Sequence, residues 1–389
     1  MTSGIDDLQI EALRNRRGEK WAHYPKDVIP AWVADMDFEI AAPIREAIIG
    51  RVNQFDCGYP VGARDTGLPE IFVERMRSKF AWEINESQVD LFNDVVQGIY
   101  FGLLALSEEQ DGVVIQTPIY PPFLSSVTET KRRTIECPLN LGDRYYEIDF
   151  DALQASIAND KRARILLLCN PHNPTGRCFT RAELEAISEI VLRYDLYVIS
   201  DEIHADLILD QVPHIPIASL GQEIAARTVT LMSASKAFNM AGVCMAFAVY
   251  GGTEIKNLFS KVPRHIRGGI SALSVAGVTA AFTEGESWLS SVLSRLHANR
   301  DLIVEHAAQN WSGIRYSPTQ ATYLAWLDCR QLPIEASAYQ FFLDKAQVAL
   351  SDGARFGHPG EGFARLNFAT SEKILKEILS RMDSALKDR

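Results

Sequence analysis

LYVISDEIH (residues 196–204) ends an apolar run in two carboxylates, Asp201 and Glu202. Three similar β-rich runs lie in the same part of the chain, at Val113–Gln116, Ile165–Cys169 and Thr228–Met232. Runs with so little polar alternation are typical of strands that are covered on both faces, as in a parallel sheet. Between two of them a helix is predicted over Thr180–Tyr194, because Thr180 and Glu183 match a capping box ahead of one apolar face. This alternation of strand and helix predicts an α/β fold.

The overall composition excludes several classes of protein. With 389 residues, 47% hydrophobic and 23% charged, the chain matches a soluble globular protein of one large or two unequal domains. A net charge of −11 opposes non-specific binding to nucleic acid or to an anionic membrane surface. No apolar run approaches the ~18 residues of a membrane span, and the N-terminus lacks the apolar core of a signal peptide. The six scattered cysteines indicate free thiols in a reducing compartment. We therefore expect a cytoplasmic protein without nucleic-acid or membrane partners.

The last hundred or so residues have a different pattern. A long amphipathic helix is predicted over Trp288–Asn310, followed by strands over Ala321–Leu327 and Ala364–Ala369 and a final helix over Ser371–Lys387. We expect a large domain over residues 46–285 and a smaller α+β domain over 286–389. Residues 1–45 are expected to form an arm that joins the smaller domain.

Polar residues follow three of the apolar runs, and ligands of open parallel sheets collect beyond these strand ends. They supply an amide (Asn173), a carboxylate (Asp201) and an amine (Lys236) flanked by hydroxyls (Ser233 and Ser235). A lysine amine forms a Schiff base with the aldehyde of pyridoxal phosphate, and an acid pairs with the pyridinium nitrogen. Upstream, the segment 94–99 with its Gly98 opens an apolar helix whose N-terminus would favour a phosphate.

Each of these residues also has an ordinary structural interpretation. Asp201 alone would suit a strand-end turn, and Lys236 alone would suit a solvated loop. The pyridoxal-phosphate prediction depends on their order and strand context together. Other chemistries have less support: no GxGxxG follows a strand, and the histidines form no HExxH, so neither a nicotinamide cofactor nor a metal is expected. The basic run 131–133 is expected to be a solvated turn.

Eight ordered motifs resemble one family over nearly the whole chain. They are WVADMDF (32–38), GYP (58–60), QTPIYPPF (116–123), CNPHNPTGR (169–177), SDEIHADL (200–207), SASKAFNMAG (233–242), ATYLAWLD (321–328) and GFARLNFAT (362–370). The chain resembles fold-type I pyridoxal-phosphate enzymes of the aminotransferase class I/II superfamily, and within it the cystathionine β-lyase-like C–S lyases of the MalY/PatB type. The resemblance implies a mostly parallel seven-stranded sheet between helices, with a smaller α+β domain.

The resemblance also implies roles around the cofactor ring. Lys236 would hold the cofactor and shuttle the Cα proton, while Asp201 would pair with the ring nitrogen. Asn173 would bind the phenolic oxygen, and Tyr120 would stack on the ring. His204 stands where many aminotransferases carry a tyrosine three residues after this aspartate, and it is assigned to the catalytic and cofactor-binding set.

Further roles are implied for the phosphate and the substrate. Backbone N–H groups of Gly98 and Ile99, with the hydroxyls of Ser233 and Ser235, would hold the phosphate. Tyr59 would reach it from a neighbouring subunit, which implies a homodimer. Cys244 occupies the position of a phosphate-binding arginine, eight residues after the lysine, so that contact is missing. Arg365 would clamp the substrate carboxylate, with Asn173 and Ala34 also assigned to substrate binding.

The implied activity is β-elimination from an S-substituted L-cysteine such as cystathionine, which gives a thiol, pyruvate and ammonia. Three alternatives remain open. The first is transamination with the same cofactor. The second is a specialised reaction on this scaffold, either cleavage of a bulky S-conjugate or an oxidative deamination. The third is a regulator that binds the cofactor without catalysis, against which the complete set of lysine, aspartate, asparagine and arginine argues.

Overall fold

The computed structural model describes residues 5, 7–62 and 65–387, and its main feature is a seven-stranded sheet. The sheet order is β2 (Val89–Phe92), β10 (Ala246–Tyr250), β9 (Thr228–Met232), β8 (Tyr197–Asp201), β7 (Ala163–Cys169), β3 (Gly112–Ile115) and β4 (Arg133–Glu136). β10 is antiparallel to both of its neighbours, whereas every other neighbouring pair in this sheet is parallel. The predicted α/β class and mostly parallel sheet are confirmed.

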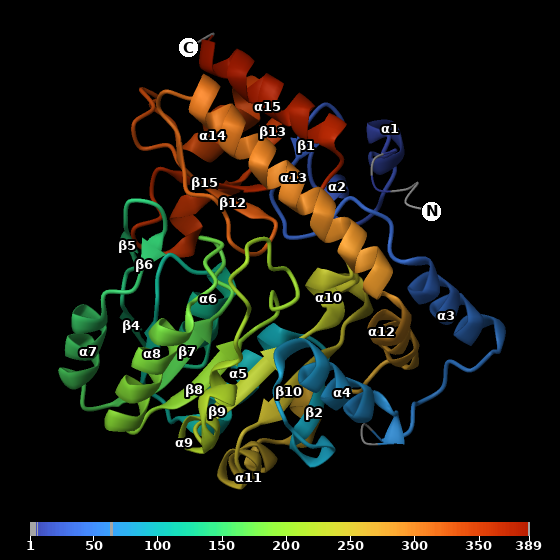
Figure 1. Cartoon of the computed structure of the whole chain (residues 1–389), viewed down its shortest axis with the longest axis vertical. Helices are drawn as coiled ribbons and strands as arrows, with labels where there is room; N and C mark the ends of the chain where they lie inside the picture. The colour runs from blue at the N-terminus through green and yellow to red at the C-terminus, as the bar shows by residue number, and fades with distance from the viewer. Residues whose placement is uncertain (1–4, 6, 63–64, 388–389) are drawn as a thin grey trace.

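Helices cover both faces of this sheet (Figure 1). In β7, Ile165, Leu167 and Cys169 face a cluster shared with α5 (Val95–Leu106), α6 (Pro121–Glu129) and α11 (Thr253–Lys261). The alternate residues Leu166 and Leu168 face α7 (Phe150–Ala158), α8 (Arg181–Arg193) and α9 (Gln222–Ala225). Burial on both faces explains why these strands are apolar throughout. The predicted capping box of α8 is present, with Thr180 as N-cap and Glu183 as its partner.

The C-terminal part contains a smaller antiparallel sheet, ordered β11 (Arg315–Tyr316), β12 (Leu324–Asp328), β15 (Phe363–Asn367) and β14 (Ser351–Asp352). The long helix α13 (Glu286–Asn310) connects the two parts of the chain, and α14 (Ala338–Ala346) and α15 (Glu372–Lys387) pack beside the small sheet (Figure 1). Near the N-terminus, β1 (Ile29–Pro30) pairs in parallel with β13 (Val348–Ala349), so this segment lies against the C-terminal part.

The remaining elements are shorter or lie at the periphery. The helices are α1 (Ile10–Leu13), α2 (Glu19–Ala22), α3 (Ala42–Asn53), α4 (Leu68–Phe80), α10 (Ala234–Ala237) and α12 (Ala272–Glu284). The short strands are β5 (Asn140–Leu141) and β6 (Tyr146–Glu147), and the 3₁₀ turns are Glu86–Gln88, Ile217–Leu220, Ala241–Val243, Arg264–Arg267 and Gly353–Phe356. No helix in the part of the chain that the structure describes is long and apolar enough to span a membrane.

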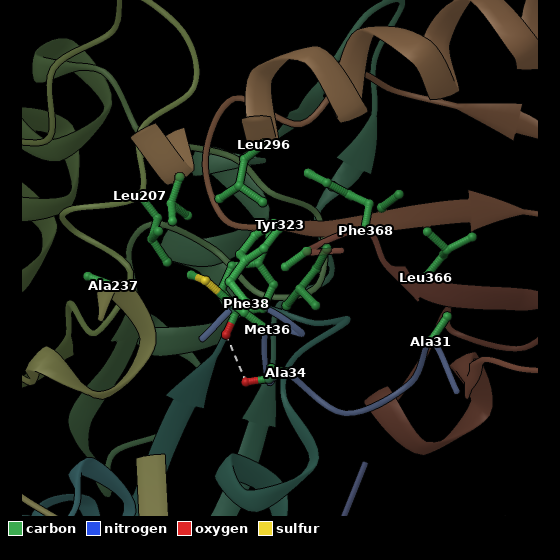
Figure 2. Close-up of a cluster of buried hydrophobic side chains, with 14 of the residues drawn as sticks. Ala31, Ala34, Met36, Phe38, Leu207, Ala237, Leu296, Tyr323, Leu366 and Phe368 are labelled. Carbon is green, nitrogen blue, oxygen red and sulfur yellow. Dashed lines mark hydrogen bonds between the residues drawn. The ribbon is translucent and has the colours of Figure 1, made fainter. Parts of the chain in front are cut away.

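The segment 31–38 lies between the two parts of the molecule; Trp32, Val33 and Asp35 are half-buried and its other residues are buried. Figure 2 shows Ala34, Met36 and Phe38 among side chains from the large part, such as Leu207, and from the small part, such as Phe368. The hydroxyl of Tyr323 donates to the carbonyl oxygen of Ala34 at 2.7 Å, the dashed line of the figure. This backbone segment is therefore held from both sides.

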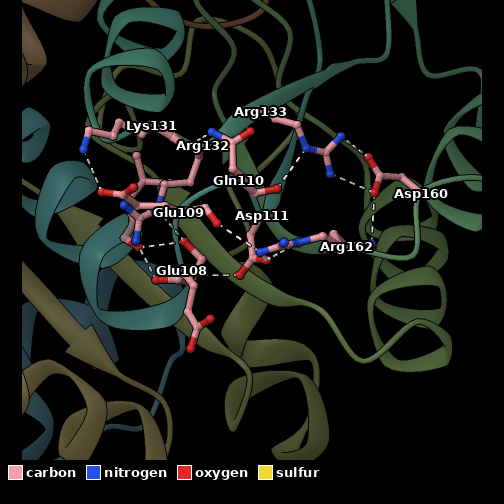
Figure 3. Close-up of polar contacts among 11 residues, drawn as sticks. Glu108, Glu109, Gln110, Asp111, Lys131, Arg132, Arg133, Asp160 and Arg162 are labelled. Atoms are coloured by element: carbon pink, nitrogen blue, oxygen red, sulfur yellow. Dashed lines mark hydrogen bonds and ion pairs between the residues drawn. The ribbon is translucent and has the colours of Figure 1, made fainter.

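In the basic run 131–133, Lys131 and Arg133 are exposed as predicted, whereas Arg132 is buried and is not part of a solvated turn (Figure 3). Arg132 is 8% exposed, and its guanidinium donates to the Thr130 carbonyl at 2.5 Å and to the Ser107 carbonyl at 2.6 Å. Ser107 is the C-cap of α5, so Arg132 satisfies a helix-end carbonyl that would otherwise lack a donor. Arg133 forms an ion pair with Asp160 at 2.7 Å.

Candidate active site

The carboxyl ends of β7, β8 and β9 bring the predicted polar groups together. Asp201 ends β8, is paired in register with Cys169 at the end of β7, and is 5% exposed. One of its oxygens accepts the N–H of Ile203 at 2.9 Å. Burial raises the pKa of this carboxyl to about 7. A buried carboxylate with so few donors is suited to a protonated ring nitrogen as its partner.

Lys236 lies on α10, directly after β9. Its Nζ donates to the carbonyl oxygen of Ala34 at 2.9 Å, the same oxygen that accepts from Tyr323. Burial lowers the pKa of the Lys236 amine, which favours the neutral, nucleophilic form. Ala34 therefore contributes a backbone acceptor that aims the amine; its assignment to substrate binding stays a prediction.

A cavity of about 190 Å³ lies between these groups. Its lining includes Ala34, Tyr120, Asn173, Asp201, His204, Ser235 and Lys236. His204 is 2% exposed, burial lowers its pKa to about 3, and its Nδ1 atom has no hydrogen-bond partner among the described residues. A planar cofactor bound here would meet the Asp201 carboxylate, for which the described residues supply one hydrogen bond, and the His204 ring, which lines the same cavity. The residues present therefore fit pyridoxal phosphate.

The phosphate end differs from the sequence prediction. Helix α5 begins at Val95 with Asp94 as its N-cap, so Gly98 lies in the second turn and its N–H already donates to the Asp94 carbonyl at 3.2 Å. The predicted phosphate contact through the N–H of Gly98 is therefore wrong, and Ile99, the other predicted contact, lies one residue further into the helix. First-turn residues Val95 and Val96 line the cavity instead.

Gly98 has a packing role. A Cβ atom at this position would lie 2.8 Å from Cδ2 of Leu231 on β9, so the glycine allows α5 to approach the sheet closely. The capping signal of Asp94 ahead of the apolar run could have identified the true helix start.

The two serines have different surroundings. Ser233 is the N-cap of α10; its Oγ accepts the N–H of Ser235 at 3.0 Å and donates to the Met245 carbonyl at 2.5 Å. The hydroxyls of Ser233 and Ser235 lie 2.6 Å apart, and Ser235 lines the cavity. Cys244 is exposed and adds no positive charge. Ser235 and the start of α5 are therefore the groups best placed for a phosphate.

Arg365 lies on β15 and is 3% exposed. Its Nη1 donates to Asn173 Oδ1 at 2.9 Å, and its Nη2 donates to the Trp32 carbonyl at 2.9 Å and to Ser351 Oγ at 3.2 Å. Its Nε has no partner among the described residues, and burial lowers its pKa to about 10. A buried guanidinium with only neutral partners and an unused donor is suited to bind a substrate carboxylate.

Tyr59 is fully exposed on the connection between α3 and α4, away from the cavity of its own chain. Phe55, Val61 and Ile266 are also exposed large hydrophobic residues. The predicted contact of Tyr59 with a neighbouring subunit stays a prediction.

Comparison with known proteins identifies the family. Residues 72–382 match the model of aminotransferase class I and II. The chain belongs to this family. It is 33% identical to cystathionine beta-lyase PatB of Bacillus subtilis over 92% of this chain and 93% of that protein. It is 31% identical to a cystathionine beta-lyase of Corynebacterium glutamicum over 97% and 99% of the two chains. Among solved structures, cystalysin of Treponema denticola, which contains pyridoxal 5'-phosphate, superposes with a TM-score of 0.91 at 30% identity, covering 96% and 97% of the two chains.

Several site residues escaped the sequence prediction. Tyr323 lies inside a quoted motif, but its bond to Ala34 depends on the packing of the two parts of the chain. Trp32 acts through its backbone carbonyl, and Ser351 reaches Arg365 because β14 and β15 are paired at these residues. No local sequence signal indicates such contacts.

Proposed function

We propose that this protein is a pyridoxal-phosphate-dependent C–S lyase that cleaves S-substituted L-cysteine to a thiol, pyruvate and ammonia. One observation carries the proposal: the Lys236 amine and the Asp201 carboxylate line a single buried cavity, and Asn173 in that cavity is hydrogen-bonded to Arg365. The similarity to two cystathionine beta-lyases over nearly their full length supports this reaction over others of the family.

Each residue of the site has its own role in the proposed reaction. Bound pyridoxal phosphate supplies an electron sink that stabilises negative charge at the substrate Cα. With the cofactor bound, Asp201 would hold the proton of the ring nitrogen, and Tyr120, which lines the same cavity, would pack against the ring. Arg365 holds the substrate carboxylate, and Lys236 Nζ removes the Cα proton. The bond between Cβ and sulfur then breaks with its electron pair on sulfur, and the released aminoacrylate hydrolyses to pyruvate and ammonia.

Two further features belong to the proposal. The homodimer is supported by the exposed Tyr59 and its apolar neighbours on one connection, which would supply a phosphate contact to the other subunit. A cytoplasmic location is supported by the scattered cysteines.

The test follows pyruvate and free thiol together after L-cystathionine is added to the purified holoenzyme. Equal amounts of both products are expected. Conversion of the bound cofactor to its amine form without pyruvate would show that the protein is a transaminase instead. Asp201→Ala is expected to retain bound cofactor but to lower the rate sharply, and an unchanged rate would contradict the role of the carboxylate.

A further inference from the structure

A second hollow adjoins the cofactor cavity. It has a volume of about 560 Å³, and its walls include Tyr24, Trp32, Tyr120, Tyr339, Arg355 and Arg365. Tyr120 lines both this outer hollow and the cofactor cavity. A substrate held by its α-carboxylate on Arg365 would therefore project its sulfur substituent into the outer hollow. Its volume lies within the range of about 300–1,000 Å³ that is typical of sites for drug-sized ligands.

Aromatic side chains form one wall of the outer hollow. The ring centroids of Tyr24 and Trp32 are 5.8 Å apart at an interplanar angle of 87°, and His23 packs against both rings at 4.7 and 4.8 Å. The hydroxyls of Tyr24 and Tyr339 are 3.4 Å apart. Mutual packing holds these rings in place, and fixed aromatic surfaces favour a flat partner through stacked or edge contacts.

A cation lies beside this wall. Burial raises the pKa of the Tyr24 phenol, and the positive charge of nearby Arg355 opposes that rise. Arg355 is exposed, and no ion pair to it is found in residues 5, 7–62 and 65–387. Of the two carboxylates that line the outer hollow, Asp352 accepts the N–H of Ala354 at 3.2 Å, and Glu19 is exposed at the start of α2. Arg355 is thus available for an anionic group.

We propose that the outer hollow selects S-conjugates of cysteine whose leaving thiol carries an aromatic ring with a distal carboxylate, which Arg355 binds. This inference rests on the proposed lyase function and adds the class of leaving group. The reaction is the same elimination: the Cα proton goes to Lys236, the bond between Cβ and sulfur breaks, and an aromatic thiolate leaves with the electron pair.

The kinetic test compares two substrates of nearly equal shape, S-(4-carboxyphenyl)-L-cysteine and S-(4-carbamoylphenyl)-L-cysteine. The holoenzyme is expected to favour the carboxylate in kcat/KM by roughly two- to fivefold, the order of an exposed charge pair. Arg355→Gln is expected to bring this ratio close to one. The matched control is Arg193→Gln on the distant helix α8, which should keep the wild-type ratio.

The aromatic wall is tested separately. Tyr24→Ala is expected to lower kcat/KM for both aryl substrates by roughly two- to tenfold relative to S-methyl-L-cysteine, because one stacking partner is lost. The comparison with S-methyl-L-cysteine corrects for any general loss of active enzyme.

A binding measurement separates this inference from the lyase proposal. Calorimetry with the inert 4-(methylthio)benzoate should detect binding to the holoenzyme that Arg355→Gln weakens and Arg193→Gln does not. If this binding is found but no cysteine conjugate is cleaved, the lyase proposal fails while the outer hollow keeps its specificity. If conjugates are cleaved without preference for the carboxylate, or if a 4-(aminomethyl)phenyl conjugate is favoured, the inference is overturned and the lyase proposal stands.

Discussion

Substitution of Arg365 can distinguish a role in substrate binding from a role in the stability of the fold. Its guanidinium is buried, donates only to neutral oxygens, and leaves Nε unpartnered. The fall in its pKa from 12.5 to about 10 corresponds to ~3 kcal/mol of unfavourable burial of the charge. Since the folded-state pKa is the lower one, this cost is present throughout the pH range below about 10.

The perturbation is Arg365→Met, which keeps an unbranched apolar stem. It removes the burial cost but also leaves Asn173 Oδ1 without this donor, at roughly 1–3 kcal/mol for an unsatisfied group. The Trp32 carbonyl still accepts from Ser351 Oγ at 2.8 Å. These effects oppose each other, so the free energy of unfolding should change by no more than about 2 kcal/mol. Loss of a buried clamp on a carboxylate costs about 3–4 kcal/mol, so kcat/KM should fall roughly 100- to 1,000-fold.

The assay couples pyruvate release from L-cystathionine to lactate dehydrogenase, and urea denaturation gives the stability. The control uses the methyl ester of an S-substituted cysteine. Wild-type enzyme should favour the free acid strongly over this ester, and the variant should lose that preference. If Arg365→Met retained a third of the wild-type kcat/KM while preferring the acid, the carboxylate-clamp argument would be refuted.

Three other substitutions address the cofactor, the packing and the pH dependence. Lys236→Ala should fold but lose turnover by at least a thousandfold together with the visible absorbance of the linked cofactor; retained lyase activity would exclude Lys236 as the base. Gly98→Ala places a Cβ 2.8 Å from Leu231, so overpacking of about 1–3 kcal/mol should exceed the ~1 kcal/mol gained in helix propensity. Urea denaturation should show a lower free energy of unfolding for Gly98→Ala than for the wild type, and a more stable variant would contradict this reasoning. His172 has its pKa lowered to about 4 by burial, so the unfolded chain binds its proton first as the pH falls below about 6.5. The free energy of unfolding should therefore fall as the pH falls from about 6.5 to 4. In urea titrations, His172→Gln should show a smaller fall over this range. An equal fall in the variant and the wild type would show that His172 is not its cause.

The parts that the sequence predicted well have local causes. The capping box at Thr180 and Glu183 involves residues three apart, and the strand Thr228–Met232 agrees with β9 at both ends. Apolar runs followed by polar residues reveal strand ends, and parallel pairing then brings Asp201 and Lys236 to the same edge without further assumptions. Local chemistry and sheet topology therefore sufficed for the centre of the site.

The predictions for Gly98 and Arg132 were wrong because both residues contact partners that are distant in the sequence. Gly98 was interpreted as a phosphate contact because glycine often opens such loops, whereas the constraint on it comes from Leu231 on a distant strand. Arg132 was interpreted as solvated because its neighbours are charged, yet the C-terminus of α5 accepts its hydrogen bonds. Both errors came from judging a residue by its sequence neighbours when a packed partner decides its role.

The segment 31–38 explains how Lys236 and Arg365 keep their positions relative to each other. Lys236 donates to the carbonyl oxygen of Ala34, which lies 202 positions earlier in the chain. Arg365 donates to the carbonyl oxygen of Trp32, two residues before Ala34. The base lies on α10, directly after β9 of the large sheet, and the carboxylate clamp lies on β15 of the small sheet, so neither sheet alone fixes the distance between them. Both are hydrogen-bonded to the same short stretch of backbone, which Tyr323 also holds through Ala34. A shift of this stretch would move the amine and the guanidinium together, and this preserves the relative position that proton removal at Cα requires.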